Sequence, residues 1–303
     1  MGMTSTNAPR IDRLLALMGA RPAPIEPGRT EYAQEVGARF HDHRGRTILG
    51  SVGVLVDAVP GGAVGRSVPA GTQTVLSQVT ATLAAPLPDR GDVVARGHAV
   101  HLDLEAGIGL SAGDLTGPDG QVCGVLTSRS IVVTRGATHA DEVFDGDPLP
   151  VPVPEPVTDR AEFADLPGLQ VVTSIASGAV ARGPLAGLFG VDMVSVDRGL
   201  VVGEFAPQAW MANYFGTVQG GNLIAVSDLL TGLAAQTLTA AAQDYRALDL
   251  CIDFVRSPAL DGGPVRVRSE VVRAGRRLAV IDTELVDTSG VILSRAHASV
   301  QLL

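Results

Sequence analysis

The stretch that decides the fold reads Asn213-Tyr-Phe-Gly216-Thr-Val-Gln219-Gly220-Gly221-Asn-Leu-Ile-Ala-Val-Ser-Asp228. Its polar first half leads into two glycines, which suit a place where the backbone passes close to another group, because they lack a β-carbon. Apolar residues then recur at helical spacing from Leu223 to Leu238. The glycines are therefore predicted at a helix N-terminus, whose free N–H groups suit a carbonyl oxygen that gains negative charge. A carboxylate inside this apolar helix, Asp228, completes a pattern that indicates acyl chemistry.

The same residues resemble the signature of the hotdog-fold acyl-CoA thioesterases of the phenylacetyl-CoA (PaaI) type. That signature is Asn-x-x-Gly-x-x-His-Gly-Gly, followed by a helix with a catalytic Asp or Glu. The matching positions are Asn213, Gly216, Gly220, Gly221 and Asp228. Gln219 departs from the pattern, because it stands where the family has His. The resemblance covers most of residues 183–303 and implies thioester hydrolysis, with coenzyme A entering only as part of the substrate and no other cofactor.

A second copy of the segment lies upstream. Residues 42–57 align without gaps on residues 213–228 and share three identities, which are Gly45 with Gly216, Gly50 with Gly221 and Asp57 with Asp228. The next prolines, Pro86 and Pro258, follow the two acids by 29 and 30 residues. We therefore predict an α+β fold of two tandem hotdog units, each with an antiparallel β-sheet wrapped around a central helix.

The predicted organisation has four parts. Residues 1–27 form an N-terminal tail with a short helix at 10–20, residues 28–136 form unit 1 with a degenerate motif, residues 137–170 form a Pro-rich linker, and residues 171–303 form unit 2. The helix of unit 1 is expected near 51–59, short or kinked because Pro60 interrupts it. Strand-like runs follow each helix, at 75–83, 93–104, 108–115 and 122–133, and at 248–255, 265–272, 278–286 and 291–300. Two linked units would supply an internal pair, with one extended sheet and a helix on each half.

In hotdog thioesterases of this type the active site lies between paired units, so the resemblance implies two unequal sites. In the first, Asp57 of unit 1 acts as general base or nucleophile. The Gly220 N–H of unit 2, with Asn213 or Gln219, stabilises the oxyanion. Family members often hold the water with a Ser or Thr near the start of the next strand, and Thr74 is the nearest candidate here.

The second site would combine Asp228 with the helix start of unit 1. There Asp42 replaces the family's Asn, and an ionised Asp42 would oppose a developing oxyanion. Leu49 stands at the position of Gly220 and would crowd the thioester. The Asp57 site is therefore predicted to be competent and the Asp228 site degraded.

Further candidates concern substrate binding. Gly221 and the aromatic residues Trp210, Tyr214 and Phe215 are expected to line the acyl pocket, with plain core packing as the alternative for the aromatic rings. Arg276 and Arg277, in a turn, are candidates for a coenzyme A phosphate, with exposed surface arginines as the alternative. Gln219 has the alternative role of a helix cap.

Composition narrows the function classes. The net charge of −9 argues against a nucleic-acid partner, and no apolar stretch approaches membrane-spanning length. The two cysteines form no CxxC motif, so no metal is expected. These features predict a cytoplasmic protein. The resemblance implies that it binds acyl-CoA and forms a homo-oligomer, a dimer or trimer of the double unit. The alternatives are an acyl-CoA or acyl-carrier binding protein without hydrolytic activity, and a hotdog hydratase, whose Asp/His loop is not visible.

Overall fold

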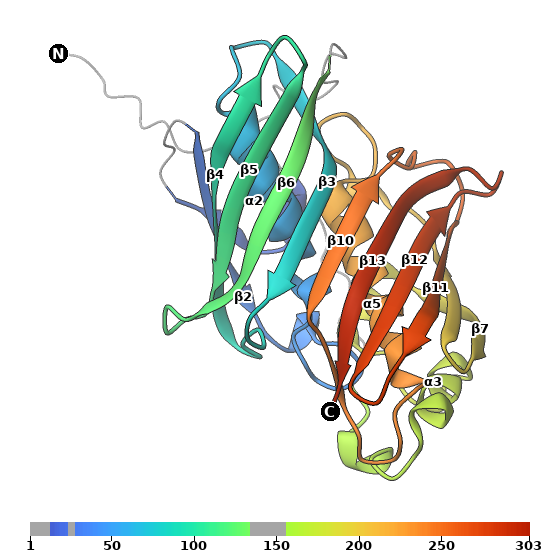
Figure 1. Cartoon of the computed structure of the whole chain (residues 1–303). Helices are drawn as coiled ribbons and strands as arrows, with labels where there is room; N and C mark the ends of the chain where they lie inside the picture. Colours follow the sequence, from blue (N-terminus) through green and yellow to red (C-terminus); the bar gives the residue numbers. More distant parts are fainter. Residues whose placement is uncertain (1–12, 24–27, 134–155) are drawn as a thin grey trace.

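The computed structural model describes residues 13–23, 28–133 and 156–303. Two units of the same architecture lie side by side, the first in blue and green and the second in orange and red (Figure 1). In each, an antiparallel sheet wraps around one helix, α2 (Gly53–Gly65) in the first unit and α5 (Gly220–Gln236) in the second. The predicted α+β architecture of two tandem hotdog units is confirmed.

The elements follow the same order in both units. The first contains α1 (Arg13–Leu17), β1 (Ala20–Pro22), β2 (Arg29–Val36), α2, β3 (Gln73–Leu83), β4 (Gly91–Asp103), β5 (Ile108–Thr116) and β6 (Val122–Val133). The second contains α3 (Gly168–Ala176), α4 (Pro184–Phe189), β7 (Asp192–Asp197), β8 (Leu200–Phe205), α5, β9 (Tyr245–Ala247), β10 (Asp249–Phe254), β11 (Val265–Ala274), β12 (Leu278–Val286) and β13 (Ile292–Leu302). Every predicted strand after a central helix is confirmed, whereas β2, β7 and β8, which precede those helices, were not predicted.

One sheet runs through both units. Strands β3 and β10 pair antiparallel, with Asp249 opposite Thr82 and Asp253 opposite Gln78. The 13 strands therefore follow the order β1-β2-β4-β5-β6-β3-β10-β13-β12-β11-β8-β7, with β9 on β13. Along β11 buried and exposed residues alternate from Val265 to Glu270, as expected for a sheet with one face on a core and one in water. The predicted extended sheet with a helix on each half is confirmed.

The prediction that the first central helix is short and ends near residue 59 was wrong, since α2 continues through Pro60 to Gly65. Proline removes one intrahelical hydrogen bond, but packing of a buried face supplies most of the stability of a helix in a protein. Val59, Ala63 and Val64 are fully buried on either side of the proline. This packing holds the helix together across the interruption.

The segment before the second unit is also partly structured. Helix α3 crosses the predicted boundary at residue 170 and packs against β7 and α5, and Phe163 joins the core. Residues 137–155 of the predicted Pro-rich linker and the first residues of the predicted N-terminal helix lie outside the described residues. Within the described ranges, no helix combines the length and hydropathy that a membrane span needs.

The two central helices cross at their N-terminal ends, and glycines make the crossing possible. A β-carbon on Gly221 would lie 2.6 Å from the Cα of Val54, and one on Gly53 would lie 2.6 Å from the carbonyl oxygen of Gly221. On the other side, a β-carbon on Gly50 would lie 2.8 Å from the carbonyl oxygen of Ala225. Only residues without a β-carbon allow this approach. The crossing places the start of each helical segment beside the carboxylate of the other unit.

Candidate active site

The loop before α5 is organised by Asn213. Its Oδ1 accepts hydrogen bonds from the backbone N–H groups of Phe215 (2.9 Å) and Thr217 (3.1 Å), and Gly216 completes the turn at a φ of 74°. The side-chain oxygen of Asn213 is therefore committed to the loop. Its amide nitrogen is the group that can donate to a ligand.

Asp42 organises the equivalent loop of the first unit in the same way. Its Oδ1 accepts from the N–H groups of Arg44 (2.8 Å) and Arg46 (3.1 Å). Burial raises the pKa of Asp42, but the charge of Arg44, the neighbouring His43 and the hydrogen bonds from Arg44 and Arg46 together hold this pKa below its usual value. The loops are thus structural equivalents, as the repeat predicted. The expected electrostatic conflict between an ionised Asp42 and an oxyanion stays a prediction, and the structure adds that this carboxylate pairs with Arg44 within its own loop.

Asp57 of α2 and Gly220 of α5 lie against each other. The Oδ1 of Asp57 is the nearest heavy atom to the place where a β-carbon on Gly220 would stand, and the ring of Phe254 lies 3.1 Å from the same place. Gly220 is the first residue of its helix, so its N–H has no intrahelical partner. Asp57 is half-buried, with part of its surface open. A carboxylate from one unit therefore faces a helix N-terminus from the other.

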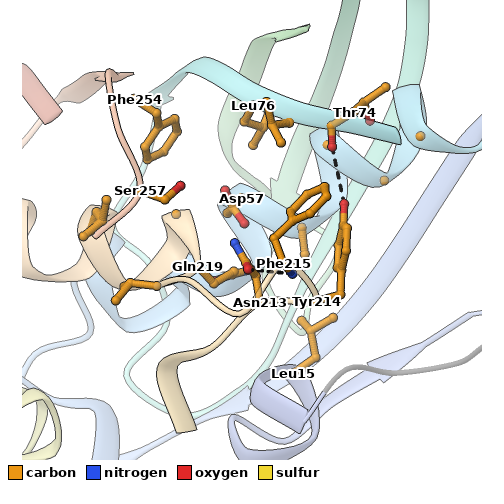
Figure 2. A pocket seen from close by; sticks show the side chains of 18 of the residues that line it. Leu15, Asp57, Thr74, Leu76, Asn213, Tyr214, Phe215, Gln219, Phe254 and Ser257 are labelled. Atoms are coloured by element: carbon orange, nitrogen blue, oxygen red, sulfur yellow. Dashed lines mark hydrogen bonds between the residues drawn. The ribbon is translucent and has the colours of Figure 1, made fainter. Parts of the chain in front are cut away.

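A cavity of about 300 Å³ opens beside this pair. Figure 2 shows Ser257 and Phe254 on one side of Asp57 and Thr74 on the other. Of the residues named from the sequence, the cavity is lined by Asp57, Asn213, Tyr214, Phe215, Gln219 and Gly220. The structure thus brings together, from two units, the residues that the sequence assigned to the first site.

Gln219 occupies the N-cap of α5. Its Oε1 accepts a hydrogen bond from the N–H of Gly221 at 3.1 Å, which satisfies one of the free donors of the helix start. Gln219 therefore has the capping role considered as its alternative, while its side chain also lines the cavity. The side-chain amide nitrogen of Gln219, like that of Asn213, is the group that can donate a hydrogen bond to a ligand.

Four predicted substrate-binding residues do not line the cavity. Trp210 packs on the ring of Phe189 at a centroid distance of 5.7 Å. Gly221 lies at the helix crossing, where it allows close packing. Arg276 and Arg277 belong to the turn between β11 and β12. For Trp210 the packing considered as its alternative is observed, and the assignment of Arg276 and Arg277 to a coenzyme A phosphate stays a prediction.

Sequence reasoning missed the far rim of the cavity. Phe254, Arg256 and Ser257, which follow β10, line it. The internal repeat could have pointed to this segment, because it is the equivalent in unit 2 of the stretch before Pro86 in unit 1. Thr74 was proposed to hold the water, but its Oγ1 lies 3.5 Å from the place of a β-carbon on Gly65. Gly65 is eight residues beyond Asp57, or about 12 Å along the helix, which leaves Ser257 as the hydroxyl on the Asp57 side (Figure 2).

Asp228 is enclosed instead of open. It is 3% exposed and accepts a hydrogen bond from the N–H of Gly50 at 2.7 Å. The hydroxyl of Tyr245 lies 2.8 Å from the place of a β-carbon on Gly232, one turn beyond Asp228. Arg44 stacks on the Tyr245 ring, 3.5 Å from its centroid. The smaller cavity of about 230 Å³ at this place is lined by Arg44 and Tyr245 but not by Asp228. These two side chains fill the space that stays open in the first site.

Replacing Asp228 by asparagine is expected to stabilise the protein above pH 6. Burial raises the pKa of Asp228 to about 6, against the opposing hydrogen bonds from Gly50 and Leu49. Because the folded pKa lies above the ordinary value of 3.8, the carboxyl favours folding below about pH 4, and this contribution is lost as the pH rises through 6. The free energy of unfolding should rise in Asp228→Asn by at most about 3 kcal/mol, because the pKa is shifted by roughly two units and each unit corresponds to 1.36 kcal/mol.

Urea unfolding at several pH values measures this difference. Burial lowers the pKa of His43 to about 4. Because His43 is present in both proteins, its contribution to the free energy of unfolding cancels when the variant is compared with the parent. The gap between variant and parent should shrink toward pH 4. A gap that does not change between pH 4 and 7 would show that Asp228 titrates normally.

No group of three or more His, Cys, Asp or Glu side chains in the described part of the chain is placed to hold a metal ion. His41 has its Nε2 at 2.8 Å from the carbonyl oxygen of Asp89. Cys123 is buried and Cys251 is partly buried, and neither forms a disulfide.

Comparisons with known proteins agree with this architecture. Residues 215–294 match the Thioesterase superfamily. Among solved structures, acyl-CoA thioesterase II from Mycobacterium marinum has a TM-score of 0.58 at 13% identity, over 96% of this chain and 98% of that one. A protein of unknown function with a hotdog fold from Alicyclobacillus acidocaldarius has a TM-score of 0.60 at 15% identity, over 95% and 98%. A Saccharolobus solfataricus protein named as a candidate esterase is 26% identical over 113 residues, 37% of this chain and 79% of that protein.

Proposed function

We propose that this tandem hotdog protein, whose second unit matches the Thioesterase superfamily, hydrolyses an acyl-CoA thioester in the cavity between its two units. The observation that carries the proposal is the contact of Asp57 from unit 1 with Gly220 at the start of α5 in unit 2. One group can activate water, and the other can bind the oxygen of the carbonyl that the water attacks. Both face a cavity large enough for an acyl chain.

The proposed reaction uses side chains of the protein and needs no cofactor. Asp57 takes a proton from water while the water oxygen bonds to the thioester carbon. The negative charge that develops on the carbonyl oxygen is stabilised by the Gly220 N–H and by the amide nitrogens of Asn213 and Gln219. The carbon–sulfur bond then breaks, the proton passes to the leaving sulfur, and the products are a carboxylic acid and free coenzyme A.

The coenzyme A part would leave the cavity past Arg256. This residue is exposed at the rim, and a guanidinium there can pair with a phosphate of the nucleotide. It takes the role that the sequence had suggested for Arg276 and Arg277. Ser257 on the same rim is the hydroxyl available to orient the attacking water.

One observation favours a second function, the binding of an acyl-CoA or acyl-carrier thioester without hydrolysis. Gln219 occupies the family's His position and its oxygen is used to cap α5. If it is only a cap, one oxyanion donor is absent, which typically costs about 10²–10³ in rate. The two functions differ in whether free thiol is released.

The purified protein is expected to release coenzyme A from at least one member of a panel of short, long and aromatic acyl-CoAs, followed with a thiol-detecting reagent. The rate should be proportional to the amount of folded protein and should persist through successive purification steps. Saturable binding of the same thioesters without release of thiol would support the binding function and contradict hydrolysis.

A further inference from the structure

Arg66 is a cation at the opposite end of the cavity from Arg256. It directly follows α2 and lines the cavity together with Tyr32 and Thr74. Its Nη1 donates to the hydroxyl of Thr30 and to the carbonyl oxygen of Arg29. Among the residues that the structure describes, Arg66 forms no ion pair. Acidic residues outnumber Lys and Arg by 32 to 23 in this chain, yet no carboxylate of the described residues neutralises this half-buried arginine.

The guanidinium keeps donors for a ligand. Both of its hydrogen bonds use Nη1 and go to neutral oxygens, whereas an arginine has five N–H donors in a planar fork. A carboxylate is the group that this fork matches best, because two parallel charge-assisted hydrogen bonds can form. The hydroxyl of Thr74, which lies near Gly65 at this end of the cavity, is suited to hydrogen-bond the same oxygen atoms.

An open path joins Asp57 to this end of the cavity. The face of α2 between them carries Gly61, Gly62 and Gly65, all of which line the cavity. In the second unit, the residue equivalent to Gly61 is Gly232, and there the Tyr245 hydroxyl closes the path. The glycines are thus part of a cavity that is continuous in one unit and blocked in the other.

The length of this path can be derived from the helix. The Nη1 of Arg66 lies 3.6 Å from the place of a β-carbon on Gly62, since helical side chains lean toward the N-terminus. Gly62 is five residues beyond Asp57, which corresponds to about 7.5 Å of helix rise. A fully extended polypeptide spans ~3.3–3.6 Å per residue, and each residue contributes three backbone bonds. An extended acyl chain therefore advances about 1.2 Å per bond. About six bonds therefore span the distance.

We propose, resting on the thioesterase function above, that the acyl group hydrolysed here ends in a carboxylate bound by Arg66. The substrate class is the coenzyme A monothioester of a linear dicarboxylic acid of roughly six to eight carbons, the length that the helix rise allows. Asp57 acts at the thioester end, and Arg66 determines specificity at the other end without contacting the reacting atoms.

The test compares adipyl-CoA with hexanoyl-CoA, and suberyl-CoA with octanoyl-CoA, because each pair has the same chain length and differs in the terminal carboxylate. The parent protein should show a kcat/KM at least about 10-fold higher for the dicarboxylic member, since a hydrogen bond to a charged group contributes about 1.5–3 kcal/mol. Arg66→Gln should abolish this preference and leave the hexanoyl-CoA rate within about 2-fold, whereas Arg66→Lys, which keeps the charge, should restore part of it.

Arg256→Gln is the matched control, because it removes one cation from the other end of the same cavity. It should lower kcat/KM for both members of a pair by the same factor. Hydrolysis of hexanoyl-CoA with no preference for adipyl-CoA would overturn the inference and leave the thioesterase function standing. An equal loss for both substrates in Arg66→Gln would also overturn it, by showing a structural role. Absence of thiol release from every thioester by the folded protein would instead contradict the thioesterase function.

Discussion

Asp57→Asn is expected to lower kcat for acyl-CoA hydrolysis by roughly 10²–10⁴-fold, the contribution typical of a positioned general base. Asparagine has nearly the same volume as aspartate, so it keeps the contact with Gly220 and the shape of the cavity. It removes only the charge and the ability to accept a proton. Steady-state release of thiol from the best substrate of the panel measures the loss.

Asp228→Asn is the matched control for this prediction. Asp228 is the equivalent carboxylate of the other unit, but it is buried behind Tyr245 and does not line the cavity. The variant should retain activity within about threefold, since no donor or acceptor of the cavity is changed. Activity that survives Asp57→Asn and disappears in Asp228→Asn would move the chemistry to the other unit and contradict the assignment of the site.

Arg44→Met is expected to destabilise the protein by about 3–5 kcal/mol, because it leaves a buried carboxylate without its counter-ion. The Arg44 side chain is 6% exposed and pairs with Asp42 at 2.7 Å and with Asp244 at 2.7 Å. It also donates to the carbonyl oxygen of Tyr245 at 2.8 Å. These contacts join the loop of unit 1 to unit 2. Urea unfolding at pH 7 measures the change.

The same loop provides the control. Arg46 pairs with Asp89, but its side chain is 53% exposed, so Arg46→Met should cost less than about 1 kcal/mol. Removing both charges in Asp42→Asn with Arg44→Met should recover part of the lost stability, because no unpaired charge then remains. Equal effects of Arg44→Met and Arg46→Met would show that burial of this network does not matter for stability.

The two halves of the repeat have kept the same loop and diverged in what fills the space beside it. Arg44 stands at the position of Phe215, and Tyr245 at the position of Thr74. In the first site, Phe215 and Thr74 border an open cavity. In the second, the guanidinium stacks on the tyrosine ring, and the cavity that remains there is not lined by Asp228. At these two positions, residues that border a cavity in one half of the repeat are replaced in the other by residues that bridge the units.

Much of the fold was predictable because its signals are local. The helix start at Gly220 and the strands after each helix follow from glycine chemistry and from the spacing of apolar residues. The pairing of Asp57 with Gly220 came from the repeat and from the family resemblance, which imply that the two units face each other. The continuation of α2 through Pro60 was not predicted, since burial on both sides outweighs the loss of one hydrogen bond.

The Asn213–Asp228 segment and its copy at 42–57 by themselves determined two hotdog units and the residues that meet between them. Only the tertiary structure decided which unit keeps an open site, because that depends on Tyr245 filling the space beside Gly232. It also decided that Arg66 and Ser257 border the cavity while Trp210 and Arg276 do not. The spacing of apolar residues along the chain indicates which face of a helix or strand is buried. Which side chains meet across a cavity is set by packing between segments that are distant in sequence, and the local spacing does not encode it.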